Sequence, residues 1–197
     1  MPRAIDYILA IVAALLLAPL MLAIALCVAA SMGSPVLFRQ SRVGRRGIPF
    51  ELVKFRSMTA GEADGKLLPD DMRTPPLGRI LRISRLDELP ELWNILRGDM
   101  AFVGPRPLLP ETIAGLGQAG VLRCSVRPGL TGLAQISGNT LLQTNEKLAM
   151  DLFYVRRRSW AFDLRILLRT PFMMVRGERI DPVLLEKANA CRGSGGC

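Results

Sequence analysis

Two adjacent carboxylates, Asp87 and Glu88, are the first residues in this sequence that could carry chemistry. Ser84 lies three residues before Asp87, which is the spacing between a helix N-cap residue and the acid of a capping box. The pattern predicts a helix that begins at Ser84, with both acids in its positively polarised first turn. Neighbouring helical residues point about 100° apart, so one acid would serve as a nucleophile and the other would support metal or substrate. Adjacent acids also occur by chance, so the pair needs support from the rest of the chain.

Basic residues near the ends of the expected elements could hold phosphate groups. The segment Val103–Pro107 places Arg106 between two prolines, which fix the backbone on both sides. A guanidinium held in this way can grip a phosphate through paired hydrogen bonds, although a rigid loop with a surface arginine has the same sequence. Lys54 and Arg56 in the string KFRSM, and Arg127 in RPGLTG, add further cations.

The composition limits the chemistry that these residues can support. The 197-residue chain has no histidine, which excludes the usual Ser-His-Asp and Cys-His triads and every metal site with a histidine ligand. Its four cysteines form no CxxC pair, so we expect neither a zinc site nor a disulfide framework, and a reducing setting is favoured. The formal net charge of +9 indicates an anionic partner. Because no nucleic-acid-binding motif accompanies that charge, we expect anionic lipids or phosphorylated small molecules and no nucleic acid.

The elements expected around these residues are mostly helical with a few short strands, so the predicted fold class is α/β. Residues 36–40 and 50–55 have the pattern of short strands around the loop GRRG. Residues 59–76 are polar and rich in Gly and Pro, which indicates a loop. A helix is expected from Leu77, and residues 143–170 form an amphipathic helical region. Its arginines and aromatic residues suit either a membrane interface or a packed surface helix.

An uncharged run of 23 residues, Ile8–Ala30, is long enough to cross a bilayer as a helix. Pro19 lies near its centre, where it removes a hydrogen-bond donor and predicts a kink. These residues leave two interpretations open: a kinked helix that spans the membrane, and a re-entrant helix that returns to the same face. Positive charge after the run places that flank in the cytoplasm, and Arg3 makes the N-terminal flank weakly positive too. The arginines after the run are Arg39, Arg42, Arg45 and Arg46.

Five strings in this chain resemble, in the same order, motifs of the bacterial sugar transferase family, the polyprenol-phosphate phosphoglycosyl transferases of the monotopic type. They lie between residues 33 and 155 and read GSPVLFRQSRVG, KFRSM, SRLDELPELWNILRGDMAFVGPRP, RPGLTGLAQ and DLFYV. The block from Ser84 to Pro107 is too long to be expected by chance. The length of the chain resembles that of the small members that contain only the catalytic core.

The resemblance implies a re-entrant membrane helix in residues 1–33 and a catalytic domain in residues 34–188, at the cytoplasmic face of the bacterial inner membrane. Residues 189–197 are expected to form a disordered tail. The resemblance further implies that Asp87 attacks the β-phosphate of a UDP-sugar and releases UMP. A polyprenol phosphate such as undecaprenyl phosphate then displaces the aspartate from the covalent phosphosugar intermediate. The implied partners are therefore a UDP-sugar, a polyprenol phosphate and membrane lipids.

The resemblance also assigns a cofactor and substrate-binding residues. Magnesium is the cofactor of the family, and Asp87 and Glu88 are its nearest candidate ligands in this chain. Basic residues in the matching strings would bind phosphates, and Gln135 ends the string RPGLTGLAQ. The residues assigned to substrate binding are Lys54, Arg56, Arg106, Arg127 and Gln135.

Three departures from the family pattern bear on the helix bend and on the sugar. Ala18 stands where a serine usually precedes the membrane proline, so one hydroxyl that could satisfy freed carbonyls is lost. Leu133 replaces a common aromatic residue, and Gly138-Asn139 lacks an arginine that is often present between such residues. Because both changes lie where nucleotide or sugar could bind, the identity of the sugar stays open.

Two other functions compete with the transferase. A membrane-tethered interaction protein that binds anionic lipid through a basic face would explain the charge and the amphipathic helices. It would leave the acidic pair and the Pro-Arg-Pro segment unexplained. A metal-dependent phosphohydrolase would need several spaced carboxylates, which this sequence does not collect.

Overall fold

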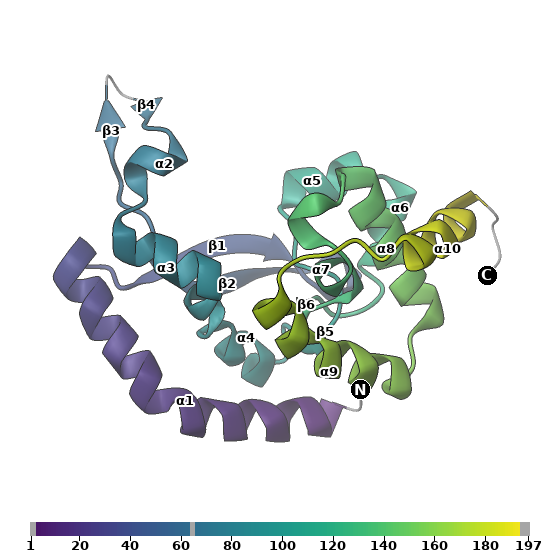
Figure 1. Cartoon of the computed structure of the whole chain (residues 1–197), viewed down its shortest axis with the longest axis horizontal. Helices are drawn as coiled ribbons and strands as arrows, with labels where there is room; N and C mark the ends of the chain where they lie inside the picture. The colour runs from purple at the N-terminus through teal and green to yellow at the C-terminus, as the bar shows by residue number, and fades with distance from the viewer. Residues whose placement is uncertain (1–2, 64–65, 194–197) are drawn as a thin grey trace.

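Helices dominate the computed structural model, which describes residues 3–63 and 66–193. The helices are α1 (Arg3–Met32), α2 (Asp70–Arg73), α3 (Pro76–Ser84), α4 (Glu91–Arg97), α5 (Pro110–Gly115), α6 (Gln118–Arg123), α7 (Leu133–Ile136), α8 (Thr144–Arg157), α9 (Trp160–Arg176) and α10 (Pro182–Gly193). The strands are β1 (Leu37–Val43), β2 (Pro49–Phe55), β3 (Glu62–Ala63), β4 (Lys66–Leu67), β5 (Ala101–Val103) and β6 (Gly129–Thr131). The predicted α/β class with a helical majority is confirmed (Figure 1).

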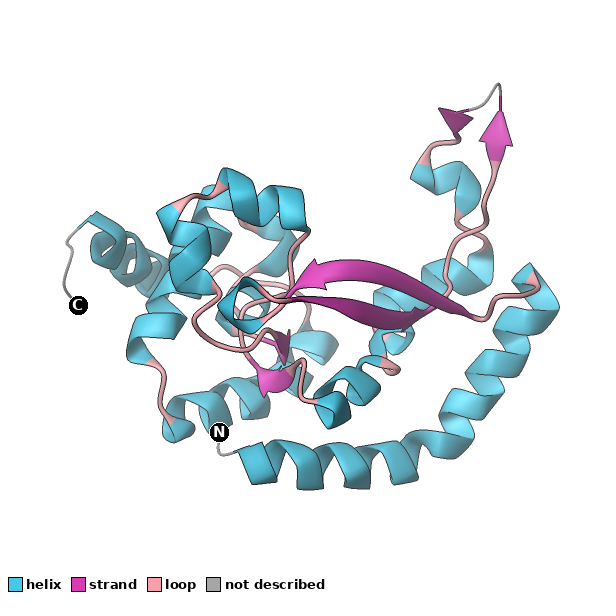
Figure 2. Ribbon diagram, turned by 180° about the vertical axis from the view of Figure 1, so that it is seen from behind, coloured by secondary structure: helices cyan, strands magenta, loops and turns pink. Residues whose placement is uncertain are grey.

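A long antiparallel hairpin of β1 and β2 runs through the middle of the molecule (Figure 2). Leu37 lies opposite Phe55 at one end, and Val43 lies opposite Pro49 at the other, next to the Arg45–Gly47 turn. The two predicted strands are confirmed, and β1 extends three residues beyond its predicted end. The hairpin therefore connects two distant regions of the molecule, one at each of its ends.

The polar segment after the hairpin is more ordered than the predicted loop. It contains the two-residue strands β3 and β4, which pair antiparallel, and the single-turn helix α2. These elements project away from the rest of the molecule (Figure 1). The expected helix from Leu77 is confirmed as α3, which begins one residue earlier at Pro76.

The helix predicted to begin at Ser84 is wrong at its start. Helix α3 ends at Ser84, and Arg85 takes a left-handed conformation with φ 57°. A helix running from Ser84 would carry Pro90 in its interior, where the ring clashes with the preceding turn. The chain instead forms a short 3₁₀ turn, Leu86–Glu88 (the 86–88 turn), and α4 begins directly after Pro90. The acidic pair therefore lies in a turn between two helices, and not in the first turn of one helix.

The amphipathic region predicted at 143–170 consists of two helices, α8 and α9. Ser159 caps the second, because its hydroxyl accepts a hydrogen bond from the backbone N–H of Phe162 at 3.2 Å. The fully buried Tyr154 on α8 ties the two helices together by donating to Asp163 at 2.6 Å. These helices pack on a core cluster that also contains buried side chains of β5 and α7, namely Val103 and Leu133.

Helix α1 is bent near its middle, where Pro19 lies, as both views of the ribbon show (Figures 1 and 2). Both arms pack against the same domain. In the first arm, Ala10 lies in a core cluster with Leu92 and Ile95 of α4. In the second arm, Val28 lies in a cluster with Phe55 and with residues of α3. The domain therefore occupies the concave side of the bend.

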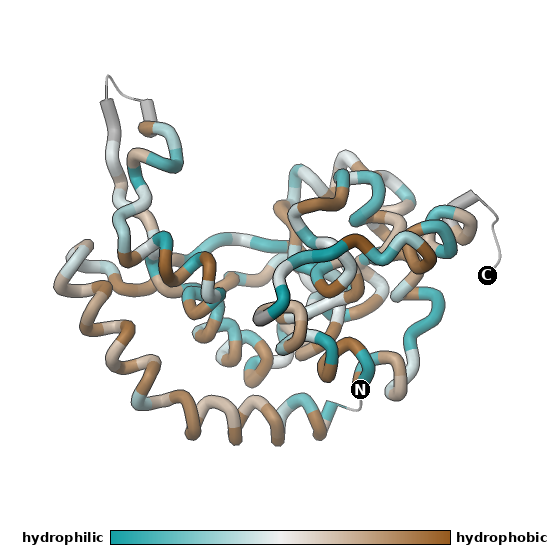
Figure 3. The backbone as a smooth tube through the Cα atoms, viewed as in Figure 1, coloured by the Kyte–Doolittle hydropathy of each residue, from teal (hydrophilic) through white to brown (hydrophobic). Residues whose placement is uncertain are grey.

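The other side of α1 is apolar and exposed (Figure 3). Its exposed large side chains are Ile5, Ile8, Leu9, Ile11, Val12, Leu15, Leu16, Leu20, Leu22 and Leu26. Among the described residues, α1 is the one helix long and apolar enough to cross a membrane. Its apolar surface faces away from the domain, which suits contact with lipid.

The C-terminal segment departs from two predictions. Residues 189–193 of the expected disordered tail belong to α10, because α10 packs on α8 and buries Ala188 in the core cluster. Residues 194–197 lie outside the described part of the chain. The sequence predicted no disulfide framework; Cys191 is nevertheless disulfide-bonded, whereas Cys27 and Cys124 are free thiols.

Candidate active site

Cations from two separate elements converge on Glu88 in the 86–88 turn. The Lys54 ammonium, from the far end of β2, lies 2.8 Å from Glu88 Oε1. The Arg106 guanidinium, from the loop after β5, lies 2.6 Å from the same oxygen. Burial alone would raise the pKa of Glu88, but the charges and hydrogen bonds of Arg106 and Lys54 outweigh it and lower that pKa to about 2. Glu88 is therefore ionised and held in place.

Asp87 has a different environment from its neighbour. Its side chain is 9% exposed, and no ion pair reaches it from any residue that the structure describes. Burial, and then the charge of Glu88, raise the pKa of Asp87, while the charges of Lys54 and Arg106 oppose that rise. Asp87 is thus a carboxylate next to a cation cluster whose oxygens are not already neutralised by a cation.

A third carboxylate, Glu91, belongs to the same cluster and was missed from the sequence. It is buried at the start of α4, and its Oε1 lies 3.1 Å from Lys54 Nζ. Burial, together with the charge of Glu88, raises the pKa of Glu91 from 4.5 to about 7, against the opposing charge of Lys54. The signal was available as the spacing Asp87-Glu88-x-x-Glu91, which brings the third acid back to the same side after one turn.

Two buried charges fix the backbone that carries Arg106. Arg123 on α6 donates one hydrogen bond to the carbonyl oxygen of Arg106. Its Nε lies 2.8 Å from a carboxylate oxygen of Asp151 on α8. Both partners are almost fully buried, whereas the Arg106 side chain is 42% exposed. The arginine between the two prolines is therefore rigid at its backbone and open at its guanidinium.

Gln135, assigned to substrate binding, lines a pocket of about 130 Å³ together with Arg106. Its amide nitrogen donates to the carbonyl of Leu130 at 3.1 Å. Its carbonyl oxygen is buried and has no hydrogen-bond partner in the described structure. An unpaired buried acceptor beside a cation suits a polar ligand that brings its own N–H or O–H donor.

Two of the assigned cations do not join the cluster. Arg56 follows β2 and donates to backbone carbonyls, to Met58 at 3.1 Å and to Pro35 at 3.4 Å. Arg127 donates to the carbonyl of Gly98 at 3.0 Å and lines a separate pocket at the opposite end of the hairpin. The structure therefore brings together Lys54, Asp87, Glu88 and Arg106, and leaves Arg56 and Arg127 outside.

The family model for bacterial sugar transferases matches residues 1–177, which is most of the chain. The chain belongs to the bacterial sugar transferase family. The uncharacterized sugar transferase EpsL of Bacillus subtilis is 41% identical over 165 residues, covering 83% of this chain and 82% of EpsL. ExoY of Rhizobium meliloti, an exopolysaccharide production protein, is 37% identical and covers 85% of this chain and 82% of ExoY.

A larger relative carries a more informative name. The UDP-glucose:undecaprenyl-phosphate glucose-1-phosphate transferase of Escherichia coli K12 is 40% identical over 181 residues. That match covers 86% of this sugar transferase but 39% of the Escherichia coli protein. The chain thus spans well under half of this relative, and about four fifths of EpsL and ExoY.

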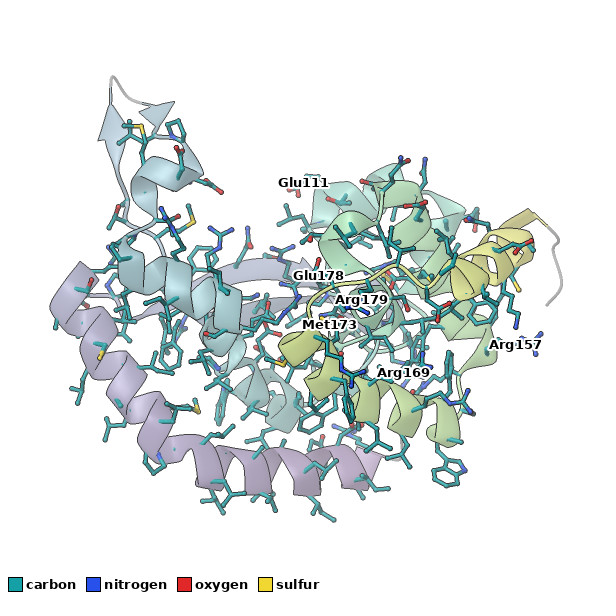
Figure 4. The ribbon with its side chains drawn as sticks, in the orientation of Figure 1. Glu111, Arg157, Arg169, Met173, Glu178 and Arg179 are labelled. Carbon is teal, nitrogen blue, oxygen red and sulfur yellow. The ribbon has the colours of Figure 1, made fainter. Side chains whose placement is uncertain are left out.

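The match to the family model ends one residue before Glu178. This acid was not predicted from the sequence to be a site residue. Glu178 lies on the segment between α9 and α10 (Figure 4). One oxygen lies 3.4 Å from the guanidinium of Arg85, and the other accepts from the Thr140 backbone N–H at 2.9 Å. Asn139 and the Thr140 hydroxyl also donate to it. This sugar transferase therefore ties its C-terminal segment to the residue before the 86–88 turn.

The acidic cluster fits a magnesium ion only in part. Within the described ranges, no group of three or more acidic or cysteine side chains has the arrangement of a metal site. One oxygen of Glu88 already pairs with both Lys54 and Arg106, whereas no cation in the described part of the chain pairs with Asp87. Magnesium commonly takes one or two protein carboxylates and completes its octahedron with substrate phosphates and water. The arrangement fits that kind of site, with Asp87 as the available ligand.

Proposed function

We propose that this sugar transferase moves a phosphosugar from a UDP-sugar to a polyprenol phosphate through a covalent intermediate on Asp87. The observation that carries the proposal is that Glu88 forms ion pairs with two cations and, among the described residues, Asp87 forms none. Glu88 is ionised and held by two cations, whereas no described residue forms an ion pair with Asp87 beside the same cations. Relatives named as UDP-glucose:undecaprenyl-phosphate glucose-1-phosphate transferases support this choice of substrates.

In the first step, a carboxylate oxygen of Asp87 attacks the β-phosphorus of the UDP-sugar. The bond from that phosphorus to the oxygen bridging the two phosphates breaks, and UMP leaves with the bridging oxygen. The exposed guanidinium of Arg106 and the ammonium of Lys54 would neutralise charge on the diphosphate. Phosphoryl transfer depends on positioning and charge neutralisation, so a site without histidine is sufficient.

In the second step, an oxygen of the polyprenol phosphate attacks the phosphorus of the aspartyl intermediate. The acyl phosphate bond to Asp87 breaks, the carboxylate is restored, and the product is a polyprenol diphosphate sugar. The attacking phosphate is already ionised, so neither step needs a general base. Glu88 keeps Arg106 and Lys54 in position throughout because its own pKa is about 2.

We propose Mg²⁺ as the cofactor, with Asp87 as its protein ligand and Glu88 beside it. When bound, the ion would withdraw charge from the diphosphate and stabilise the departing UMP. Arg106 and Lys54 occupy one oxygen of Glu88, so the contribution of Glu88 to the metal would come from its other oxygen.

We propose that α1 is re-entrant and places this site at the cytoplasmic face of the bacterial inner membrane. Both arms of α1 pack on one domain, the first against α4 and the second against α3. A straight spanning helix would carry one arm away from the domain across about 30 Å of hydrocarbon. The bend at Pro19 lets both ends of α1 stay near one surface, where a lipid phosphate can reach Asp87.

The experiment that tests the proposed function is a screen of UDP-sugars for UMP release. The purified full chain, with Mg²⁺ and polyprenol phosphate, is expected to release UMP from at least one UDP-sugar and to form a lipid-linked product. UDP-glucose is tried first because the named relatives use it. If UDP-sugars are consumed with release of UDP instead of UMP, the β-phosphate is not transferred and the proposal is wrong.

A further inference from the structure

A second basic pocket lies at the tip of the β1–β2 hairpin, at the opposite end of β2 from Lys54. Its volume is about 270 Å³. The lining residues come from the hairpin turn, the end of α4 and the residues before β6. They are Gly44, Arg45, Arg46, Ile48, Pro49, Phe50, Gly98, Asp99 and Arg127.

The pocket has more positive charge than its acids neutralise. Three arginines line it, and Arg3 reaches the edge formed by Gly98. Asp99 is the one acid among the described residues of the lining, and it pairs with Arg97 at 3.4 Å. Burial, and then the charges of Arg3 and Arg45, lower the pKa of Arg127. These groups repel one another, and an anion in the pocket would relieve that repulsion.

The backbone of the hairpin tip is held in an unfavourable conformation. Arg46 has φ 61°, the left-handed region that side chains other than glycine rarely adopt. Its backbone N–H donates to the carbonyl of Cys124 at 2.6 Å, which holds the turn against α6. At Gly98, with φ 86°, a Cβ would come within 2.6 Å of the Arg3 guanidinium. Arg46, which is kept in this conformation although it is not glycine, lies directly in the pocket lining.

The pocket lies next to the membrane-facing helix. Arg3 is the first residue of α1, whose outer side is exposed and apolar. Ile48 lies in the pocket lining beside Arg45 and Arg46, and its side chain is 64% exposed. Arginines beside an exposed aliphatic side chain match a ligand that has an anionic head and an apolar body. A free phosphate ion would use the arginines only.

The pocket is too far from Asp87 to hold the reacting phosphate. Strand β2 runs from Pro49 in the pocket to Lys54 in the catalytic cluster, and five residues of extended strand span roughly 16 Å. A phosphate in this pocket therefore belongs to a molecule that is not transferred.

We propose that this pocket binds the phosphate headgroup of an anionic glycerophospholipid from the surrounding bilayer. The phosphate lies among Arg45, Arg46 and Arg127, and the acyl chains pass Ile48 toward the apolar side of α1. Bound lipid fixes the N-terminal arm of α1 and the hairpin tip at one depth in the headgroup layer. The inference rests on the proposed membrane topology and does not depend on the chemistry at Asp87.

Native mass spectrometry of the detergent-purified full chain tests the proposal, with phosphatidylglycerol and phosphatidylcholine as probes. The wild type is expected to retain one phosphatidylglycerol and to release it only at higher collision energy than phosphatidylcholine. In Arg46→Gly and Arg45→Gln, the apparent Kd for phosphatidylglycerol should rise about fivefold or more. Arg46→Gly should unfold at the same or a higher temperature, because glycine adopts the left-handed conformation without strain.

A matched control is Arg157→Gln, which removes one exposed positive charge at the far end of α8 (Figure 4). This variant should retain the lipid as the wild type does. Equal losses in Arg157→Gln and Arg46→Gly would show nonspecific attraction to positive charge and overturn the proposal. Displacement of the lipid by millimolar inorganic phosphate would identify a free-anion site instead. UMP release measured in the same samples separates a failure of this proposal from a failure of the catalytic one.

Discussion

At the scale of single residues, the two acids of the site differ in the ion pairs that they form. Lys54 and Arg106 are both occupied by one oxygen of Glu88, and this pairing holds the Glu88 pKa at about 2. The same two cations act on Asp87 only through space, since no ion pair reaches it from the described residues. In the proposed reaction, an incoming diphosphate would bind the exposed guanidinium of Arg106, and the oxygens of Asp87 would remain available for attack.

Arg106→Lys should reduce activity strongly even though the charge is kept. A single ammonium cannot bond Glu88 and a phosphate in the planar, paired manner of a guanidinium. The loss is roughly 1.5–3 kcal/mol, or about 10- to 150-fold in kcat/KM for UMP release. Arg79→Lys on the exposed side of α3 is the control and should leave kcat/KM unchanged. An Arg106→Lys enzyme with wild-type kinetics would reduce Arg106 to a surface residue.

Glu91→Gln should change the pH dependence of stability. The pKa of Glu91 is about 7 in the folded protein, above its ordinary value of 4.5. Between those values the folded chain keeps a proton that the unfolded chain has lost, so this group lowers the free energy of unfolding as pH rises. The variant should match the wild type near pH 5 and be more stable near pH 8, by on the order of 1 kcal/mol. Urea unfolding at both pH values measures the difference; equal differences at the two pH values would contradict this account.

The acidic pair, Lys54 and Arg106 could be identified from the sequence because each stands in a distinctive string. Glu91 was missed although its spacing, four residues after Asp87 and three after Glu88, is visible in the sequence. Arg127 shares its residue type and its flanking proline with Arg106 but lies at the other end of β2. The sequence shows which residues are cations, but the end of β2 near which Arg106 and Arg127 lie is determined by tertiary packing.

At the scale of elements, the position of Asp87 depends on how α3 ends. Arg85 turns the chain with φ 57°, and the 86–88 turn follows at once. A left-handed arginine at this point is strained, and its side chain pairs with Glu178 from the C-terminal segment. Ser84 was predicted to be an N-cap because the capping-box spacing is present. A helix that begins at Ser84 is excluded because Pro90 would lie in its interior. A capping-box spacing predicts the start of a helix only where the residues that follow it can also be helical.

Glu178→Ala should loosen this connection. The substitution removes the ion pair with Arg85 and the hydrogen bonds from Asn139 and Thr140, with an expected loss of about 1 kcal/mol in stability. Arg85→Ala should cost less when Glu178 is already Ala, because the pair can be lost only once. A double-mutant cycle by thermal unfolding measures the coupling. Strictly additive losses would show that the 3.4 Å contact contributes nothing.

At the scale of the whole molecule, the bend of α1 determines which side of this helix packs on the domain and which side is exposed. The sequence left a spanning and a re-entrant helix open, because Pro19 is compatible with both. The packing of Ala10 on α4 and of Val28 beside Phe55 is a tertiary property and could not be read from an apolar run. Those contacts place both arms against one domain and favour the re-entrant form.

Cysteine labelling tests that topology. A cysteine is placed at position 2 of a cysteine-free variant, and intact cells are treated with a membrane-impermeant maleimide. Position 2 is expected to stay unlabelled until the cells are lysed, as is a reference cysteine placed at Arg157 in the domain. Labelling of position 2 but not of position 157 in intact cells would show that α1 spans the membrane.

The central claim, that Asp87 is the nucleophile, is tested most directly by mass spectrometry of the enzyme mixed with its UDP-sugar and no polyprenol phosphate. Up to one UMP per chain is expected, together with a mass increase of one phosphosugar on the peptide that contains Asp87. Addition of polyprenol phosphate should remove the adduct, and Asp87→Asn should form neither UMP nor adduct. UMP release that begins only when the acceptor is present, with no adduct at any stage, would contradict the account.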